Sequence, residues 1–153
     1  MSTAVYLFGV TGRMGQKIKD IVDTTDGLEF VGGYSRSLDN TEPTRKPDVV
    51  IDFSLPESLP ALKSFMEKHP CALVSGITGY GEKEFAELSE LAKTSPVFWS
   101  ANMSFGVYLM CQLTEALAKF ENFYKFQIEE THHIHQKDKL SVTALIIEKA
   151  ARR

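Results

Sequence analysis

Residues 4–15, AVYLFGVTGRMG, join a short apolar run to three glycines placed three residues apart. The uninterrupted apolar run 4–8 predicts a strand that is buried on both faces. Residues 13–22 continue with apolar side chains at helical spacing, so the glycines lie between a strand and a helix. Such a turn lets the backbone approach a pyrophosphate, which the N–H groups and the positive dipole end of the helix would bind. A tight turn without any ligand is the alternative interpretation.

Further apolar runs alternate with helical segments along the chain. Strands are predicted at residues 28–34, 49–53, 71–75 and 97–99, and helices from Pro56, at 82–93 and at 105–120. This alternation predicts an α/β fold of the Rossmann type, a parallel sheet with helices on both faces. Residues 124–131 alternate between apolar and polar, which is typical of a strand with one face in water, and Ser141 begins a last helix. We therefore expect a dinucleotide-binding domain over 1–121 and a partial second α+β domain over 122–153.

The composition excludes several classes of protein. Hydrophobic residues make up 43% and charged residues 24% of the 153 residues, as in globular proteins and unlike disordered ones. The net charge of -3 offers no basic surplus for a nucleic acid. The longest apolar run, 4–10, is too short to span a membrane, and no signal peptide is visible. The two cysteines, Cys71 and Cys111, indicate buried thiols in a reducing cytoplasm.

The end of the second predicted strand should contact the adenosine ribose of a dinucleotide. An NAD site places Asp or Glu there, whereas this chain has Tyr34, Ser35 and Arg36. A hydroxyl beside a guanidinium suits a 2′-phosphate, because Arg binds phosphate oxygens in a bidentate manner. We therefore predict NADPH as the cofactor. NADH is the alternative if Arg36 is merely a solvated charge.

Three of the four histidines lie within residues 132–135. On a continuing strand, His133 and His135 share one face and His132 lies on the other. Such a set cannot converge on one ion, so we expect no metal site. Proton transfer is the second interpretation, because histidine titrates near physiological pH. A solvated strand end without a role is the third.

A possible carboxylate site follows the histidines. Ser141, Val142 and Thr143 begin the last predicted helix, whose N–H groups and neighbouring hydroxyls would bind a carboxylate. The alternative is that Ser141 is an ordinary N-cap, a position that Ser favours.

Five motifs together resemble the 4-hydroxy-tetrahydrodipicolinate reductase (dihydrodipicolinate reductase) family of lysine and diaminopimelate biosynthesis. They are GRMG (12–15), VVIDFSLPE (49–57), SGITG (75–79), SANMSFGV (100–107) and EETHHIHQKDKLSVTAL (129–145), which occur in the family's order and are spread over essentially the whole chain. The resemblance implies an NAD(P)H-dependent oxidoreductase that reduces a small dicarboxylate, 4-hydroxy-tetrahydrodipicolinate, to tetrahydrodipicolinate. It also implies a Rossmann cofactor domain, a smaller substrate and oligomerisation domain, and a cytoplasmic homo-oligomer.

The resemblance further assigns roles to individual residues. The implied cofactor contacts are Gly9, Gly12, Arg13, Met14 and Gly15 at the pyrophosphate, Ser35 and Arg36 at the ribose, and Gly76, Thr78, Gly79, Ala101, Asn102, Met103 and Ser104 near the nicotinamide. His132 matches the proposed general acid. Lys137 follows the family's Lys position by one residue, and we expect it to shift one place and supply the cation facing the substrate. The implied substrate contacts are His133, Ser141, Val142 and Thr143.

Three departures from the family pattern support an alternative hypothesis. Gln136 stands where the family has Lys, and Val142 stands where it has Gly. Gln offers a neutral hydrogen bond in place of a charge, and Val avoids the positive φ that glycine tolerates. Family members also continue past the last helix, whereas this sequence stops at Arg153. The alternative is a shortened, catalytically impaired homologue that binds a dinucleotide or a partner, unless the sequence simply lacks further C-terminal residues.

Overall fold

The computed structural model describes residues 1–38, 42–120, 122, 125, 127–131 and 141–152. The chain forms two compact units, Met1–Ser100 and Ala101–Arg153. The domain boundary predicted after residue 121 stays a prediction, and the compact units divide after Ser100. No helix among the described residues is long and apolar enough to cross a lipid bilayer.

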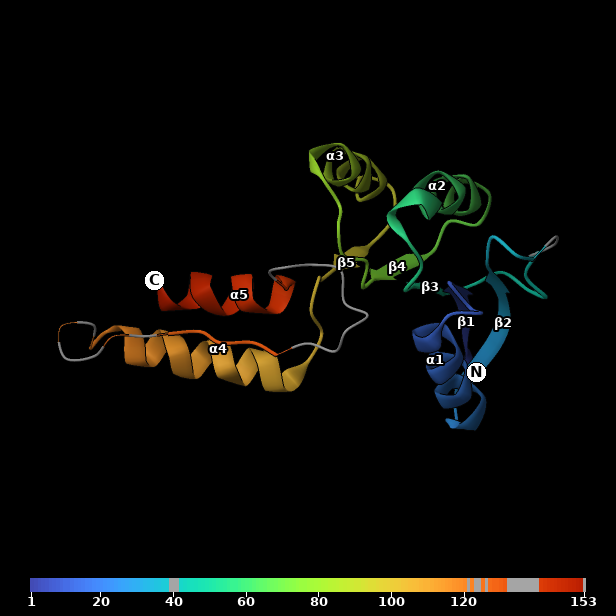
Figure 1. The fold of residues 1–153 in the computed structure, drawn as a ribbon. Coiled ribbons are helices and arrows are strands. Elements are labelled where there is room, and N and C mark those ends of the chain that lie inside the picture. Colours follow the sequence, from blue (N-terminus) through green and yellow to red (C-terminus); the bar gives the residue numbers. More distant parts are fainter. Residues whose placement is uncertain (39–41, 121, 123–124, 126, 132–140, 153) are drawn as a thin grey trace. The chain divides into compact units, whose positions relative to one another are not determined.

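The first unit is built on a five-stranded sheet (Figure 1). The strands are β1 (Thr3–Phe8), β2 (Leu28–Tyr34), β3 (Val49–Asp52), β4 (Ala72–Ser75) and β5 (Val97–Trp99), in the order β2-β1-β3-β4-β5. Every neighbouring pair is parallel, which confirms the predicted Rossmann-type α/β fold. The strand order reverses between β1 and β3, and ligands of such sheets bind at that point, beyond the carboxyl ends of the strands.

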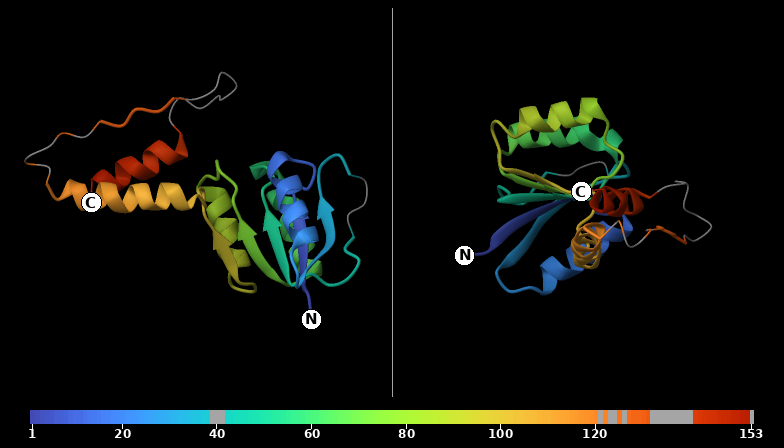
Figure 2. Two further views of the ribbon diagram at one scale, coloured as in Figure 1. Left: turned by 90° about the horizontal axis from the view of Figure 1, so that it is seen from below. Right: turned by 90° about the vertical axis from the view of Figure 1, so that its left-hand side faces the viewer.

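Helices cover both faces of this sheet. α1 (Arg13–Thr24) lies on one face, and α2 (Leu59–Lys68) and α3 (Glu82–Leu91) lie on the other (Figure 2). A short 3-10 helix, η1 (Pro56–Ser58), leads into α2. In β1, Tyr6 and Phe8 enter the core cluster that includes α2, whereas Val5 and Leu7 pack with Val22 of α1. Because successive side chains of a strand point to opposite faces, a strand covered on both faces must be apolar at consecutive positions, and residues 4–8 of β1 are apolar and buried.

The second unit contains two helices that lie side by side, α4 (Phe105–Ala118) and α5 (Val142–Ala151) (Figures 1 and 2). The last predicted helix, beginning at Ser141, is thereby confirmed. The strand predicted at 124–131 is wrong for its described part, since residues 127–131 form no strand. A strand needs a neighbouring strand with which to exchange backbone hydrogen bonds, and the described part of this unit contains no strand with which residues 127–131 could pair.

Candidate functional site

The glycine turn after β1 is closed by its own backbone. Gly9 has φ 81°, a conformation that favours glycine, and its N–H donates to the Tyr34 carbonyl at 2.9 Å. The Gly12 N–H donates to the Gly9 carbonyl at 2.9 Å. A Cβ at Gly15 would lie 2.1 Å from that same Gly9 oxygen, so a side chain cannot fit there without a backbone shift. Gly9 and Gly15 are therefore required by the turn itself.

Gly12 is the N-cap of α1, and no side chain in the described part of the chain caps the first turn of this helix. The helix also has no acidic residue in that first turn. An uncapped N-terminus of a helix presents backbone N–H donors and a partial positive charge. The turn can therefore receive an anion such as a pyrophosphate.

A cavity of about 420 Å³ lies at the ends of β1, β2 and β3, where the strand order reverses. Four residues predicted as cofactor contacts line it, Gly9, Gly12, Ser35 and Arg36. Thr11, Ser37, Phe53 and Ser54 also line it, and sequence reasoning had not singled them out. The motif VVIDFSLPE contains Phe53 and Ser54, so it was the available signal for those two. Arg13 and Met14 are exposed on the first turn of α1 and do not belong to this lining.

The end of β4 adjoins the same cavity through an aromatic ring. A Cβ at Gly76 would lie 2.3 Å from Cε1 of Phe53, which shows how closely the Phe53 ring packs on Gly76. Gly79 has φ 86°, and both Thr78 and Gly79 are exposed. Gly76 thus packs against the lining residue Phe53, whereas none of Gly76, Thr78 and Gly79 lines the cavity itself.

Two buried polar side chains, Asp52 and Tyr80, lie at the carboxyl end of β3 and follow that of β4 in the sequence, respectively. Oδ1 of Asp52 accepts hydrogen bonds from the Ser54 N–H at 2.9 Å and from the Ser54 hydroxyl at 2.6 Å. Burial raises the pKa of the Asp52 carboxyl above its ordinary value. Burial, followed by the nearby Asp52 carboxyl, raises the pKa of Tyr80 to about 12. Tyr80 therefore keeps its proton over the physiological range of pH.

The second unit gathers several of the other predicted site residues. The Asn102 side-chain amide donates to Oγ1 of Thr143 at 2.9 Å, and the Ser104 N–H donates to Oδ1 of Asn102 at 2.8 Å. The Ser104 hydroxyl then accepts from the Val107 N–H at 3.4 Å and caps α4. Ala101 and Met103 flank Asn102 in the chain. The predicted nicotinamide-side loop and the predicted substrate contact Thr143 are therefore in direct contact.

A carboxylate from this chain lies at the N-terminus of α5. Glu130 accepts hydrogen bonds from the Ser141 N–H at 2.9 Å and from the Ser141 hydroxyl at 2.5 Å. The Ser141 hydroxyl accepts from the Ala144 N–H at 3.0 Å, so Ser141 is the N-cap of the helix. Val142 is the first helical residue, and no described residue other than glycine has a positive φ.

Three predicted residues, His132, His133 and Lys137, lie outside the described residues, as does Gln136. In the part of the chain that the structure describes, no group of three or more His, Cys, Asp or Glu side chains is placed to hold a metal ion.

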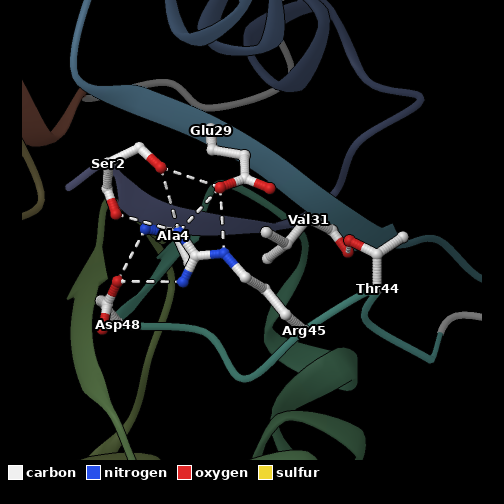
Figure 3. Close-up of polar contacts among 7 residues, drawn as sticks. All are labelled: Ser2, Ala4, Glu29, Val31, Thr44, Arg45 and Asp48. Carbon is white, nitrogen blue, oxygen red and sulfur yellow. Dashed lines mark hydrogen bonds and ion pairs between the residues drawn. The ribbon is translucent and has the colours of Figure 1, made fainter.

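A second cavity, of about 590 Å³, lies at the amino-terminal ends of the strands β1, β2 and β3. Four of its lining residues, Ser2, Glu29, Arg45 and Asp48, are joined by hydrogen bonds and ion pairs (Figure 3). Arg45 donates to Glu29 from Nε at 2.9 Å and from Nη2 at 2.8 Å, and its Nη1 lies 3.6 Å from the Asp48 carboxylate. Asp48 also accepts from the Ala4 N–H at 2.8 Å. This network ties the loop before β3 to the starts of β1 and β2, which is a structural role.

Comparisons with known proteins agree with the motifs. The family model described as dihydrodipicolinate reductase, N-terminus, matches residues 3–103, and the one described as dihydrodipicolinate reductase, C-terminus, matches residues 106–153. The 4-hydroxy-tetrahydrodipicolinate reductase of Rickettsia rickettsii (strain Sheila Smith) is 37% identical over 144 residues, which are 92% of this chain and 60% of the relative. The reductase of that name from Clostridium novyi (strain NT) is 34% identical over 157 residues, 95% of this chain and 62% of the relative.

The fold also has a solved counterpart. The dipicolinate-bound dihydrodipicolinate reductase from Paenisporosarcina sp. TG-14 superposes with a TM-score of 0.72 at 18% identity, and the match covers 99% of this chain and 66% of that one. The chain thus spans about three fifths of the length of these curated relatives.

Proposed function

The chain belongs to the dihydrodipicolinate reductase family, and from this premise we propose that it is an NAD(P)H-dependent oxidoreductase of lysine and diaminopimelate biosynthesis. Its reaction is the reduction of 4-hydroxy-tetrahydrodipicolinate to tetrahydrodipicolinate, in which hydride and a proton are added and the 4-hydroxyl group leaves as water. The solved counterpart was determined with dipicolinate bound, which supports a dicarboxylate substrate for this chain as well. We further propose that it works as a homo-oligomer in the cytoplasm.

The observation that carries this proposal is the glycine turn at the edge of the cavity. Two positions in the turn exclude side chains, since Gly9 has φ 81° and a Cβ at Gly15 would lie 2.1 Å from the Gly9 oxygen. The adjoining cavity lies where the strand order reverses, the usual site for a dinucleotide in a sheet of this topology. These features fit the pyrophosphate and adenosine portions of NAD(P)H.

NADPH is the proposed cofactor. Ser35 and Arg36 line the cavity at the end of β2, and no described residue of this lining is acidic. The carboxylate that would accept a hydrogen bond from the ribose hydroxyl of NADH is therefore missing from the described lining. A guanidinium beside a hydroxyl favours a 2′-phosphate instead.

The remaining site residues are proposed on the family pattern. A bound reduced nicotinamide supplies hydride, and the protein orients it and the substrate. His132 donates the proton, and Lys137 provides a cation for the dicarboxylate. His133 and Thr143 contact the substrate, with Thr143 held by the Asn102 amide at 2.9 Å. In this proposal Ser141 is the N-cap of α5 and does not contact the substrate, because its N–H and hydroxyl both donate to Glu130.

A turnover assay tests the proposed reaction. The purified chain is mixed with 4-hydroxy-tetrahydrodipicolinate and NADPH, and the loss of NADPH absorbance is followed. We expect turnover well above background, and an exchange of His132 for Asn should reduce it by about two orders of magnitude, the usual contribution of a general acid. Folded protein without any turnover would contradict the proposed activity.

A further inference from the structure

Three hydroxyl side chains form a continuous string at the cavity where β1 and β2 end. Oγ1 of Thr11 lies 2.8 Å from Oγ of Ser35, and Oγ of Ser35 lies 2.9 Å from Oγ of Ser37. All three residues line the cavity of about 420 Å³. Thr11 and Ser37 are exposed and Ser35 is half-buried, so a ligand in the cavity can reach the string.

One of the three hydroxyl protons is not needed for the hydrogen bonds among these side chains and can be donated to a ligand. Three hydroxyls carry three protons, and the two hydrogen bonds between them use two. The Ser37 N–H adds a backbone donor to Oγ of Ser35 at 3.3 Å. Any of the hydroxyls can also rotate towards a stronger acceptor. A ligand group with several acceptor oxygens therefore suits this position better than one that must donate a proton.

The charge around the string points to an anion. Arg36 lines the same cavity, and none of its described lining residues carries a carboxylate. A phosphate monoester carries close to two negative charges near neutral pH and has three strong acceptor oxygens. Hydrogen bonds from hydroxyls to such a charged acceptor are about twice as strong as bonds between neutral groups. A sugar hydroxyl has neither the charge nor the number of acceptor atoms.

On the basis of the proposed function, we infer that Thr11 and Ser37 act together with Ser35 to bind the 2′-phosphate of NADPH, and that they set the preference of this chain for NADPH over NADH. Thr11 belongs to the glycine turn itself. The turn therefore supplies a specificity determinant in addition to its backbone contacts with the pyrophosphate.

The experiment measures the dissociation constants of NADPH and NADH for the wild-type chain, Thr11→Val and Ser37→Ala. Val has nearly the shape of Thr but no hydroxyl. Each variant should weaken NADPH binding by about tenfold, the usual effect of losing a hydrogen bond to a charged group. NADH binding should change less than about twofold, since NADH has no 2′-phosphate, and this measurement also shows that the variants are folded.

Two further variants sharpen the result. Thr11→Ser keeps the hydroxyl and should retain the wild-type ratio of the two constants. Ser89→Ala removes a hydroxyl that donates to the Phe85 carbonyl on α3, away from the cavity, and should also leave the ratio unchanged. An unchanged ratio in Thr11→Val and Ser37→Ala would overturn this inference while leaving the proposed function intact. A wild-type chain that is folded and binds neither nucleotide would overturn both.

Discussion

The carboxylate of Glu130 is bonded to Ser141 twice, through the backbone N–H at 2.9 Å and through the side-chain hydroxyl at 2.5 Å. Ser141 is the N-cap of α5, so a negative charge lies at the positive end of this helix. The sequence left two interpretations of Ser141 open, a contact with a substrate carboxylate and an ordinary N-cap. In the structure, the carboxylate that Ser141 binds is provided by the chain itself.

Replacing Glu130 should therefore destabilise the second unit. Glu130→Gln removes the charge from the helix terminus and leaves one acceptor oxygen in place of two. We expect a loss of about 1–2 kcal/mol in the free energy of unfolding, measured by urea titration with far-UV circular dichroism. Glu129→Gln is the matched control, because Glu129 is the exposed neighbour. Equal effects of the two substitutions would show that the bond to Ser141 contributes nothing.

The two helical glycines Gly15 and Gly106 should respond in opposite directions to replacement by Ala. A Cβ at Gly15 would lie 2.1 Å from the Gly9 oxygen, so Gly15→Ala must displace the turn and weaken dinucleotide binding by at least about tenfold. At Gly106 the closest atom lies 3.7 Å away. Gly106→Ala should stabilise the protein by about 0.5–1 kcal/mol, because Ala has the higher helix propensity. Nucleotide titration of both variants checks the loss of binding in Gly15→Ala, and thermal unfolding of both checks the gain in stability in Gly106→Ala.

The ion pair between Glu29 and Arg45 predicts a dependence of stability on pH. Hydrogen bonds from Arg45 and then from Ser2 lower the pKa of Glu29 from its ordinary value of 4.5. A lowered pKa in the folded state adds stability above pH 4.5, and this stability is lost as the pH falls through the folded pKa. The difference in urea midpoint between wild type and Glu29→Gln should thus be present at pH 7 and shrink below pH 4.5.

The Arg45→Met background is the control for that titration. Without the guanidinium, Glu29→Gln should change the midpoint by a similar, small amount at every pH. A difference that persists at pH 3 in the wild-type background would rule out the ion pair as its source.

The contact between Asn102 and Thr143 should be detectable as an energetic coupling. Thr143→Val removes the oxygen to which the Asn102 amide donates at 2.9 Å. A double-mutant cycle of Asn102→Ala and Thr143→Val should give a coupling of about 0.5–1.5 kcal/mol in unfolding free energy. Additive effects of the two substitutions would mean that the bond does not form in solution.

The strands and the glycine turn were predictable because their causes are local. An apolar run such as 4–8 is required wherever both faces of a strand are buried, and β1 is buried on both faces. The turn follows from the positive φ at Gly9 and the close approach at Gly15, which glycine alone permits. The predicted ends of most elements differ from the observed ones by a few residues, as fraying helix ends and short strands allow.

Contacts between distant segments were not predictable from the same patterns. The bond between Thr11 and Ser35 depends on β1 and β2 lying side by side, and the bond between Glu130 and Ser141 joins residues that are 11 positions apart in the sequence. The strand expected at 124–131 had the right alternation, but alternation does not supply a pairing partner. Its described part, 127–131, accordingly forms no strand.

Calorimetric titration of the folded chain with NADPH and with NADH tests the central claim most directly, because the claim is that the turn at Gly9, Gly12 and Gly15 holds a dinucleotide. We predict saturable binding of both nucleotides, with NADPH the tighter ligand. Absence of binding by either nucleotide to protein with an intact far-UV spectrum would contradict the account.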